Sequence, residues 1–462
     1  MNAGAGLTGR TGRTQVFEVS TLYGAATLAA ALDAGMFEPG RRVLLVTNNA
    51  AVPEAAATLD EMTGWAAIAA RFDTVVDWNE TVFPNHPSLW APPETDTAAW
   101  QRLLRVAWDL GNGPLDLVVE SVHAKPAAAL AEIFADADVH VYADGLMSYG
   151  PTRERLLWPT ACRVQRLLHL DLLPGLTPLL LSEFGAPAEI VPDAAFRAVL
   201  DEISGACAEP AVARRVPGER TAVILGQYLA ALNILSAAQE EGLHERMLRG
   251  AARAGCAHVV FKPHPTAPAQ YSKALEKAAA DAGVRLTVLD TPMLAETVFD
   301  RVGPDLVVGC FSTAMLTASV YYGIPIARVG TDLVLGRLRP FQNSNRVPVS
   351  LVDAYVPDIE ALTGGLETLP GTPEDAGAAL GALVRVLGYT MQPRMHAPLR
   401  GGAEQWLAEH QGGLAARYVR RSKLTALALP GGFASGVAGQ MPGRRAALRL
   451  VRKVRARTVG KS

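Results

Sequence analysis

An apolar run that ends in a charged, proline-flanked loop constrains the fold of this chain more than any other stretch. Residues 259–261 predict a buried β-strand, and Lys-Pro-His-Pro follows directly at residues 262–265. The two prolines end the strand, so Lys262 and His264 belong to a loop. In α/β folds, ligand-binding side chains gather at the carboxyl ends of parallel strands. The stretch therefore predicts an α/β protein with a ligand site at Lys262, His264 and Pro265.

The same pattern of strand and polar loop recurs at residues 306–313. An apolar run over 306–311 leads into Ser312 and Thr313, and a helical pattern follows over 314–322. A hydroxyl at this position caps the helix, and the free N–H groups and positive dipole end attract anions. A helix cap and a turn are each common without a ligand, but here both follow neighbouring predicted strands. The two loops together predict a phosphate-binding site.

The length of 462 residues exceeds what one hydrophobic core usually serves, so two domains are expected. Hydrophobic residues make up 49% of the chain and charged residues 19%, which is typical of a globular protein and excludes a largely disordered one. Predicted strands alternate with helices in both halves, and a proline-rich stretch over 174–217 separates the halves. We expect α/β domains at 14–200 and 218–400, with late helices and a basic tail at 401–462.

The cysteines and the net charge limit the environment and the partners. The four cysteines are scattered, without the spacing of a zinc site or of a disulfide framework, which suits the cytoplasm. The net charge of −2 predicts no general affinity for nucleic acid. No apolar run has the length of a signal-peptide core or of a transmembrane helix. We therefore expect neither export by that route nor a membrane span.

The tail over residues 444–462 is strongly basic. It carries eight Lys and Arg residues and no acid, and apolar residues lie between the cations. Clustered cations near anionic lipid each contribute about 1 kcal/mol, so we expect the tail to bind the inner face of the cytoplasmic membrane. The alternative is an unstructured end that keeps the protein in solution.

Loops that follow the other predicted strands supply further candidates for the site. In the first half these are Ser20, Tyr23, Glu120, His123, Asp144 and the later Tyr149. In the second half they are Gly226 and Gln227, with Glu296 on a short helix over 293–299. Loops at the carboxyl ends of a parallel sheet share one edge. We expect the two sets of loops to face one cleft.

Other motifs do not support a site. Asp136 and Asp138 match the D-x-D pattern with which many sugar transferases hold a metal ion, but they precede a predicted strand. They would lie at the amino end of the sheet, away from the ligand edge, so a surface turn is the better interpretation. The sequence contains no P-loop motif, no G-x-G-x-x-G after a strand and no H-E-x-x-H. Neither an NTPase nor a dehydrogenase is supported.

Three short blocks resemble motifs of bacterial sialyltransferases. Residues 142–150, 262–265 and 311–313 are similar to the acidic-Gly, His-Pro and Ser-Ser/Thr motifs, most of all to those of the α-2,8-polysialyltransferase family. The motifs occur in the same order as in the family, and the resemblance extends over about residues 14–395. The basic tail is not part of it. It implies a GT-B-like fold, in which two Rossmann-like domains face an interdomain cleft. It also implies inverting transfer of sialic acid or a related nonulosonic acid from a CMP-activated donor to a glycan acceptor, without metal or cofactor.

The resemblance implies roles for individual residues. His264 with Ser312 and Thr313 would stabilise the departing CMP phosphate, which His264 would also protonate, and Glu296 would bind the ribose of the nucleotide. The remaining donor-side candidates are Gly226, Gln227, Lys262 and Pro265. Asp144 would be the general base, although Ala143 replaces the first of two adjacent acids in the family motif. The acceptor-side candidates are Ser20, Tyr23, Glu120, His123 and Tyr149, with Glu120 and His123 as the other possible bases.

Two other functions stay open at the level of sequence. One is a CDP-polyol phosphotransferase of the teichoic-acid type, which shares a similar fold and a His-Pro feature. The other is a non-catalytic protein that binds a glycan or a nucleotide. Turnover of a CMP-sugar identifies a sialyltransferase, and turnover of CDP-glycerol identifies a phosphotransferase. Nucleotide binding without turnover of either identifies a non-catalytic binding protein.

Overall fold

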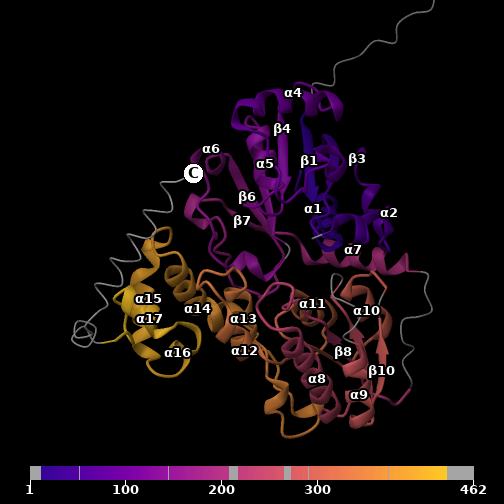
Figure 1. Ribbon diagram of the computed structural model, residues 1–462, viewed down its shortest axis with the longest axis vertical. Coiled ribbons are helices and arrows are strands. Elements are labelled where there is room, and N and C mark those ends of the chain that lie inside the picture. The colour runs from indigo at the N-terminus through magenta and orange to yellow at the C-terminus, as the bar shows by residue number, and fades with distance from the viewer. Residues whose placement is uncertain are drawn as a thin grey trace, which may run out of the picture. The chain divides into compact units, whose positions relative to one another are not determined.

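The computed structural model describes residues 12–50, 52–143, 145–207, 217–264, 272–289, 291–372 and 374–433. Asp144, Pro265 and the basic tail therefore lie outside the described residues. The chain forms two compact units, which meet in the sequence at Val384 and Arg385. The first unit contains two sheets, and the second contains late helices (Figure 1).

The first sheet consists, within the described residues, of seven parallel strands in the order β3-β2-β1-β4-β5-β6-β7. The strands are β1 Thr14–Val19, β2 Arg41–Val46, β3 Thr74–Asp77, β4 Leu115–Val119, β5 Asp138–Ala143, β6 Val164–His169 and β7 Ala188–Ile190. The helices are α1 Leu22–Asp33, α2 Trp65–Ala69, α3 Trp78–Val82, α4 Thr97–Ala107, α5 Ala127–Ile133, α6 Trp158–Ala161 and α7 Asp193–Gly205. The strand order reverses between β1 and β4, so the loops after these strands open a crevice where ligands bind in such sheets.

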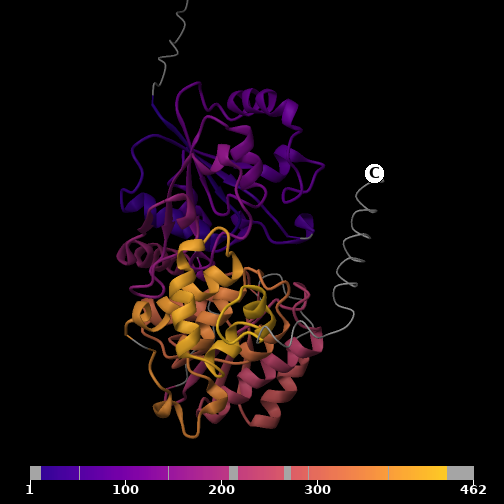
Figure 2. The same ribbon diagram turned by 90° about the vertical axis from the view of Figure 1, so that its left-hand side faces the viewer.

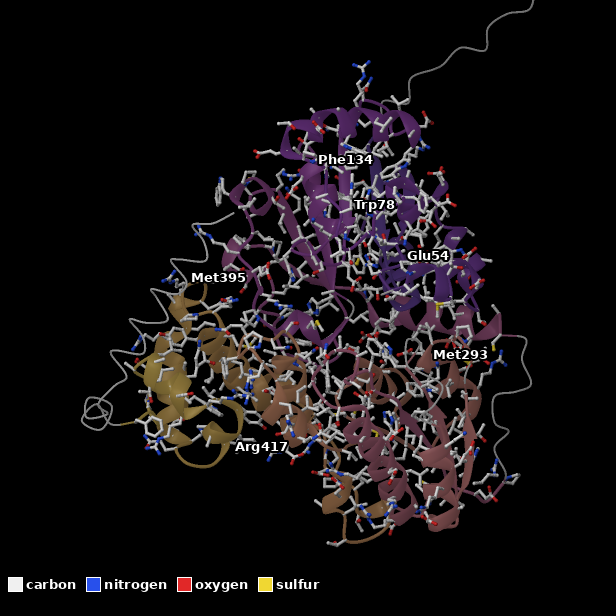
Figure 3. All side chains as sticks on the ribbon, in the orientation of Figure 1. Glu54, Trp78, Phe134, Met293, Met395 and Arg417 are labelled. Carbon is white, nitrogen blue, oxygen red and sulfur yellow. The ribbon has the colours of Figure 1, made fainter. Side chains whose placement is uncertain are left out.

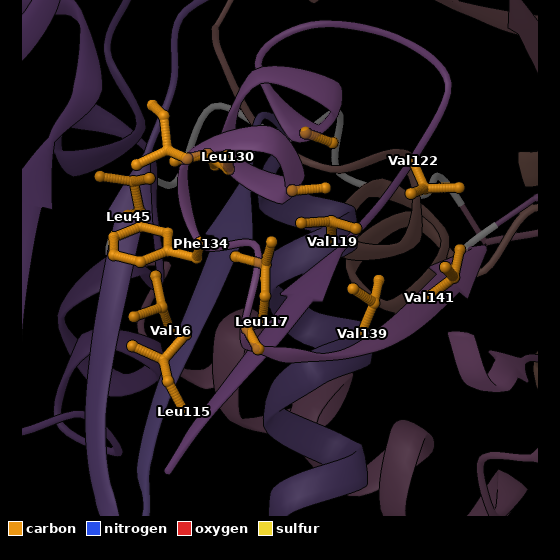
Figure 4. Packing of buried hydrophobic residues seen from close by; sticks show 14 of the residues in the cluster. Val16, Leu45, Leu115, Leu117, Val119, Val122, Leu130, Phe134, Val139 and Val141 are labelled. Carbon is orange, nitrogen blue, oxygen red and sulfur yellow. The ribbon is translucent and has the colours of Figure 1, made fainter. Parts of the chain in front are cut away.

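The core of this sheet follows from its apolar strands. Every residue of β1 and β4 is buried, as expected of parallel strands that helices cover on both faces. Val16, Leu117 and Val139 lie in one cluster with Leu130 of α5, and Figure 4 shows these side chains meeting on one face of the sheet. Each such side chain contributes about 1.5–3 kcal/mol through burial. The packing holds the carboxyl ends of β1, β4 and β5 in fixed register.

The second sheet has, within the described residues, five parallel strands in the order β10-β9-β8-β11-β12. The strands are β8 Thr221–Leu225, β9 His258–Lys262, β10 Arg285–Val288, β11 Leu306–Gly309 and β12 Ile326–Arg328. The helices are α8 Ala237–Arg253, α9 Ser272–Ala282, α10 Ala295–Val302, α11 Thr313–Tyr322, α12 Thr331–Arg337, α13 Arg346–Tyr355 and α14 Ala376–Met391. Both sheets are thus parallel and alternate with helices, which confirms the predicted architecture of two Rossmann-like domains.

Helix α7 follows the last strand of the first sheet and packs against α1 and α10. Its Phe196 contacts the rings of Tyr23 at 5.4 Å and Tyr321 at 5.3 Å between centroids. The Tyr321 hydroxyl donates a hydrogen bond of 3.1 Å to Asp193, and Arg197 donates to the carbonyl oxygen of Tyr321. Aromatic packing of this kind contributes about 0.5–1.5 kcal/mol per pair beyond area burial. The helix therefore connects the two Rossmann-like domains through packing as well as through the chain.

The second unit contains α15 Arg400–Glu409, α16 Leu414–Tyr418 and α17 Arg421–Ala426, which are the yellow helices of Figure 2. Its buried side chains include Leu407, Tyr418 and Leu424. The late helices expected after residue 400 are present. Among the described residues, no helix is both long and apolar enough to span a membrane.

Candidate active site

A cavity of about 310 Å³ lies at the carboxyl edge of the first sheet. The loop after β4 contributes Glu120 and His123, and the segment after β5 contributes Gly145. The second domain contributes Thr313 at the start of α11, and Asn345 precedes α13 on the opposite wall. The cavity thus brings together loops that lie far apart in the sequence, as the prediction of one shared cleft requires.

A contact between the two domains in this cavity joins the segment at Gly145 to Thr313. The backbone N–H of Leu146 lies 3.5 Å from Oγ1 of Thr313. A Cβ atom at position 145 would lie 2.8 Å from the same oxygen, so any other residue there would force the Thr313 side chain or the loop to move. The acidic-Gly loop and the Ser-Thr loop therefore meet directly.

The Ser-Thr loop has the predicted helix cap. Ser312 is the N-cap of α11, and its hydroxyl accepts a hydrogen bond of 3.3 Å from the N–H of Ala314. Thr313 is the first residue of the helix, and its carbonyl oxygen accepts a bond of 3.1 Å from the Thr317 hydroxyl. The positive end of the α11 dipole points at the cleft in which Thr313 lies. This end of the helix is suited to an anionic ligand.

A half-buried acid, Glu120, and a buried acid, Glu18, lie side by side at the cavity edge of the first sheet. Glu120 lines the cavity, and its Oε2 accepts a hydrogen bond of 2.9 Å from the Ser20 hydroxyl. The N–H of Glu120 lies 3.4 Å from Oε2 of Glu18, which is 2% exposed. Burial, and then the charge of Glu120, raise the pKa of Glu18 to about 8, so Glu18 holds its proton at neutral pH. Burial also raises the pKa of Glu120, which makes its carboxylate a stronger proton acceptor.

His123 and Arg153 add nitrogen groups to the same cavity. Burial lowers the pKa of His123, so its ring is largely neutral at pH 7, and the Ser121 hydroxyl lies 3.4 Å from Nε2 of that ring. Arg153 was missed at the level of sequence, because it lies in a loop without any motif around it. Asn345 was missed for the same reason. Only the tertiary path of these loops shows that the two side chains reach the cavity.

The loop after β9 is packed closely on the loop after β8. The N–H of Gly226 donates a bond of 2.8 Å to the carbonyl oxygen of Lys262. A Cβ atom at position 226 would lie 2.9 Å from the backbone N of His264, so the two loops approach this closely only because residue 226 is glycine. The ring of Tyr228 stacks on that of His264, with centroids 5.0 Å apart and planes 12° apart. Gln227 turns back to its own loop and donates to the carbonyl oxygens of Leu225 and Gly226.

The prediction that Lys262 lies in a loop was wrong: Lys262 is the buried last residue of β9, because the strand continues up to Pro263. Burial lowers the pKa of Lys262 to about 8, and the charge of Glu296 opposes that shift. Burial raises the pKa of Glu296, which is 2% exposed, and its Oε1 has no hydrogen-bond partner among the described residues. Loss of hydration, and then the Lys262 charge, lower the pKa of His264 to about 4. His264 is exposed, so solvent screens both effects in part.

Not every candidate lies at the 310 Å³ cavity. Tyr149 is fully buried, its hydroxyl accepts a bond of 3.2 Å from the Leu173 N–H, and burial raises its pKa. Tyr23 packs on Phe196 instead of lining the cavity. Lys262, His264 and Glu296 form their own cluster on the second domain and do not line the cavity. Asp144 and Pro265 lie outside the described residues.

The D-x-D motif has the predicted structural role. Asp138 begins β5, so the motif lies at the amino end of the sheet. Asp136 accepts from Arg105 at 3.0 Å, and Asp138 accepts from Arg13 at 3.1 Å. The prediction of a surface turn is confirmed. Over the part of the chain that the structure describes, no three His, Cys, Asp or Glu side chains are grouped as a metal site would require.

Comparison with known proteins identifies the family. The family model for Alpha-2,8-polysialyltransferase (POLYST) matches residues 15–331. No curated protein matches the chain. A solved sialyltransferase GT-B domain from Photobacterium damselae is 10% identical, with a TM-score of 0.38 over 73% of this chain and 95% of that chain. MurG from Acinetobacter baumannii is 12% identical, with a TM-score of 0.39 over 84% of this chain and 95% of that one.

A further solved structure, a UGT transferase from Siraitia grosvenorii in complex with UDP, is 11% identical, with a TM-score of 0.40 over 89% of this chain and 99% of that chain. Similarities this distant support no conclusion about substrate. The family match, in contrast, spans more than half of the chain and contains Gly145, Lys262, His264, Ser312 and Thr313. The chain is a sialyltransferase-like glycosyltransferase with a GT-B-like architecture, and it belongs to the alpha-2,8-polysialyltransferase family.

Proposed function

We propose that the protein transfers sialic acid or a related nonulosonic acid from a CMP-activated donor to a glycan acceptor, in the synthesis of a cell-surface polysaccharide. The transfer inverts the anomeric centre and uses no metal ion. One observation carries the proposal: the N-terminus of α11 at Thr313 and the carboxylate of Glu120 line one cavity between the two domains. Such a site offers an anion-binding group on one wall and a proton acceptor on the other, which direct displacement requires.

The second domain supplies groups for the donor. Negative charge grows on the CMP phosphate as the bond to the sugar breaks, and the helix N-terminus with Ser312 and Thr313 stabilises that charge. A bound phosphate favours the protonated form of a neighbouring imidazole, so ligand binding raises the low pKa of His264 and prepares it to protonate the leaving group. A ribose hydroxyl would satisfy the unpartnered Oε1 of Glu296.

The first domain supplies the general base. A sugar hydroxyl attacks only as its proton leaves, and a carboxylate with a raised pKa is suited to accept that proton. Glu120 has this property and lies in the cavity. Asp144 precedes Gly145 at the position of the family motif, and Ala143 beside it departs from that motif. Glu120 belongs to the first domain and the phosphate groups belong to the second, which is consistent with inversion.

His264→Ala is expected to lower the rate of transfer about 10²-fold or more, because both phosphate stabilisation and proton donation are lost. The fold should survive, since His264 lies on a partly exposed loop. The rate is measured as transfer from CMP-sialic acid, and stability is measured by thermal unfolding. The affinity for CMP is measured in the presence of EDTA, which removes divalent metal ions. His410→Ala, a ring on a late helix that bonds to its own turn, is a matched control.

Undiminished transfer by His264→Ala, or a strict requirement for Mg²⁺, would contradict the proposed phosphate site. CDP-glycerol serves as the second substrate in the same assay. Its turnover, without turnover of the CMP-sugar, would assign the protein to the phosphotransferases instead. CMP binding without turnover of either would show a binding protein.

We further propose that residues 444–462 hold the enzyme peripherally on the inner face of the cytoplasmic membrane. The tail carries eight cations and no acid, which favours anionic lipid. Full-length protein is expected to sediment with vesicles of anionic lipid at low salt, and protein truncated after residue 443 is not. Transfer to a soluble acceptor should be the same for both. Equal sedimentation of the two proteins would refute the role of the tail.

A further inference from the structure

The ring of Tyr228 has no role in the chemistry described above, although it contacts the side chain proposed as the acid. It stacks on the ring of His264, with centroids 5.0 Å apart and planes 12° apart. The two residues belong to different loops, after β8 and after β9, at the carboxyl edge of the second sheet. Met293, which follows β10 at the same edge, is labelled in Figure 3. An aromatic contact thus joins the loop of the proposed acid to its neighbour.

The backbone on both sides of Tyr228 is held by side chains of α8. The N–H of Gln227 donates a bond of 2.9 Å to Nε2 of His244. The N–H groups of residues 229 and 230 donate to the two carboxylate oxygens of Glu240, at 3.1 Å and 2.8 Å. Glu240 and His244 are each 1% exposed and lie one turn apart on the helix. Movement of this loop would break bonds to buried polar groups, so the position of Tyr228 is well defined.

His244 also connects this loop with the strand that leads to His264. Burial lowers the pKa of His244 to about 4, so its ring is neutral at pH 7 and Nε2 acts as an acceptor. The centroid of the ring lies 5.2 Å from that of Phe261, the residue before Lys262 in β9. The N–H of Gly226 adds its hydrogen bond to the carbonyl oxygen of Lys262. The two loops are therefore joined by packing and by the backbone.

The stack restricts a side chain that would otherwise rotate in solvent. His264 is exposed, and rotation of its imidazole out of the present plane would separate the two ring faces. A proton donor must lie within about 3 Å of the accepting atom, so the direction of the ring N–H affects the rate. The face of an aromatic ring also attracts a cation, so the stack is retained when His264 gains its proton.

We propose that Tyr228 is a positioning residue, which holds the imidazole of His264 in the plane from which it protonates the leaving CMP phosphate. The proposal rests on the proposed function, in which His264 is the acid. Tyr228 acts through the face of its ring, because the two ring planes are nearly parallel. Tyr228→Phe keeps this face, whereas Tyr228→Leu keeps an apolar side chain without a flat face. The two variants therefore separate orientation of the imidazole from simple packing.

A double-mutant cycle tests this role through the rate of transfer. Tyr228→Leu is expected to lower kcat about tenfold with little change in the KM of the donor, because a misaligned acid slows bond cleavage more than it weakens binding. Tyr228→Phe should keep most of the rate. In a His264→Ala background, Tyr228→Leu should cause no further loss, because no imidazole is left to orient. Phe433→Leu, which removes a ring packed on Arg421, is the matched control and should behave as the wild type.

NMR of the histidine ring protons gives a second readout, which requires no turnover. The signals of His264 are identified by their absence from His264→Ala. The ring current of Tyr228 should shift them upfield in the wild type and in Tyr228→Phe, but not in Tyr228→Leu. Addition of CMP should raise the pKa of His264 in the wild type, and by a smaller amount in Tyr228→Leu.

A normal kcat in Tyr228→Leu, or the same loss of rate with and without His264, would overturn the proposal. So would His264 signals without an upfield shift in the wild type, a result that needs no variant of Tyr228 to fold. A rise of the His264 pKa on CMP binding that is as large in Tyr228→Leu would overturn it as well. If the upfield shift and the CMP response are as expected but the wild type transfers no sugar, the proposed function fails and the orienting role of Tyr228 is supported.

Discussion

Glu120→Gln is expected to lower the rate of transfer about 10²-fold or more, with CMP affinity unchanged. Gln keeps the shape of the side chain and still accepts the hydrogen bond of the Ser20 hydroxyl, but it cannot take a proton at neutral pH. We propose that CMP binds to the other domain, so its binding should not respond. Steady-state transfer to a soluble glycan at saturating donor, together with calorimetric CMP binding, measures both effects.

The dependence of rate on pH distinguishes a base from a merely structural acid. The raised pKa of Glu120 means that the rate should fall as the pH decreases through a range above that of ordinary carboxyl groups. Glu120→Asp keeps a carboxylate and should recover part of the rate. Glu132→Gln, an exposed acid on α5, should behave as the wild type. Near-normal turnover by Glu120→Gln would assign the base to Asp144, for which Asp144→Asn is the corresponding test. Near-normal turnover by both variants would assign the base to His123.

Glu18→Gln is expected to stabilise the first domain, most strongly at alkaline pH. The folded-state pKa of Glu18, about 8, lies above its ordinary value of 4.5. Between these values the unfolded chain has released a proton that the folded chain retains, so the free energy of unfolding falls as the pH rises from 4.5 towards 8. Each pKa unit corresponds to about 1.4 kcal/mol, so the free energy of unfolding falls by about 5 kcal/mol at most. The observed fall should be smaller, because Glu18 and Glu120 titrate as an interacting pair.

The Gln side chain resembles the protonated acid and accepts the same hydrogen bond from the Glu120 N–H. Urea unfolding of both proteins across this pH range measures the difference, which should be small at the acidic end and grow towards the alkaline end. Glu132→Gln controls for the loss of an exposed charge. Parallel stability curves for Glu18→Gln and wild type would show that Glu18 is not buried as a neutral acid.

Much of the architecture was predictable because buried parallel strands have a simple pattern. The runs before Lys262 and Ser312 are almost wholly apolar, and both became strands with their polar residues at the carboxyl edge. The cap at Ser312 followed from helix chemistry alone. The close approach at Gly145 was predictable as a turn, but its contact with Thr313 was not, because the partner lies 168 positions away in the sequence and only the fold brings it near.

The residues that sequence reasoning missed share a physical reason. Glu18 lies in a strand between Phe17 and Val19, so simple alternation places it on a solvent face, whereas helices cover both faces of β1. Tyr149 was expected on the acceptor side because it belongs to the motif block over residues 142–150, yet its ring is buried. The exposure of Phe83 is likewise not encoded in any sequence pattern. Burial of a single polar or apolar side chain is decided by its neighbours in space.

The contact between Gly145 and Thr313 has a consequence for turnover. A separation of 3.5 Å between the Leu146 N–H and the threonine oxygen is too long for a strong bond, so it opposes opening only weakly. Glycine at position 145 leaves room for the two loops to meet, since an added Cβ atom would lie 2.8 Å from the threonine oxygen. Separating the two loops at this point costs one weak bond, so this contact opposes the release of a product only slightly.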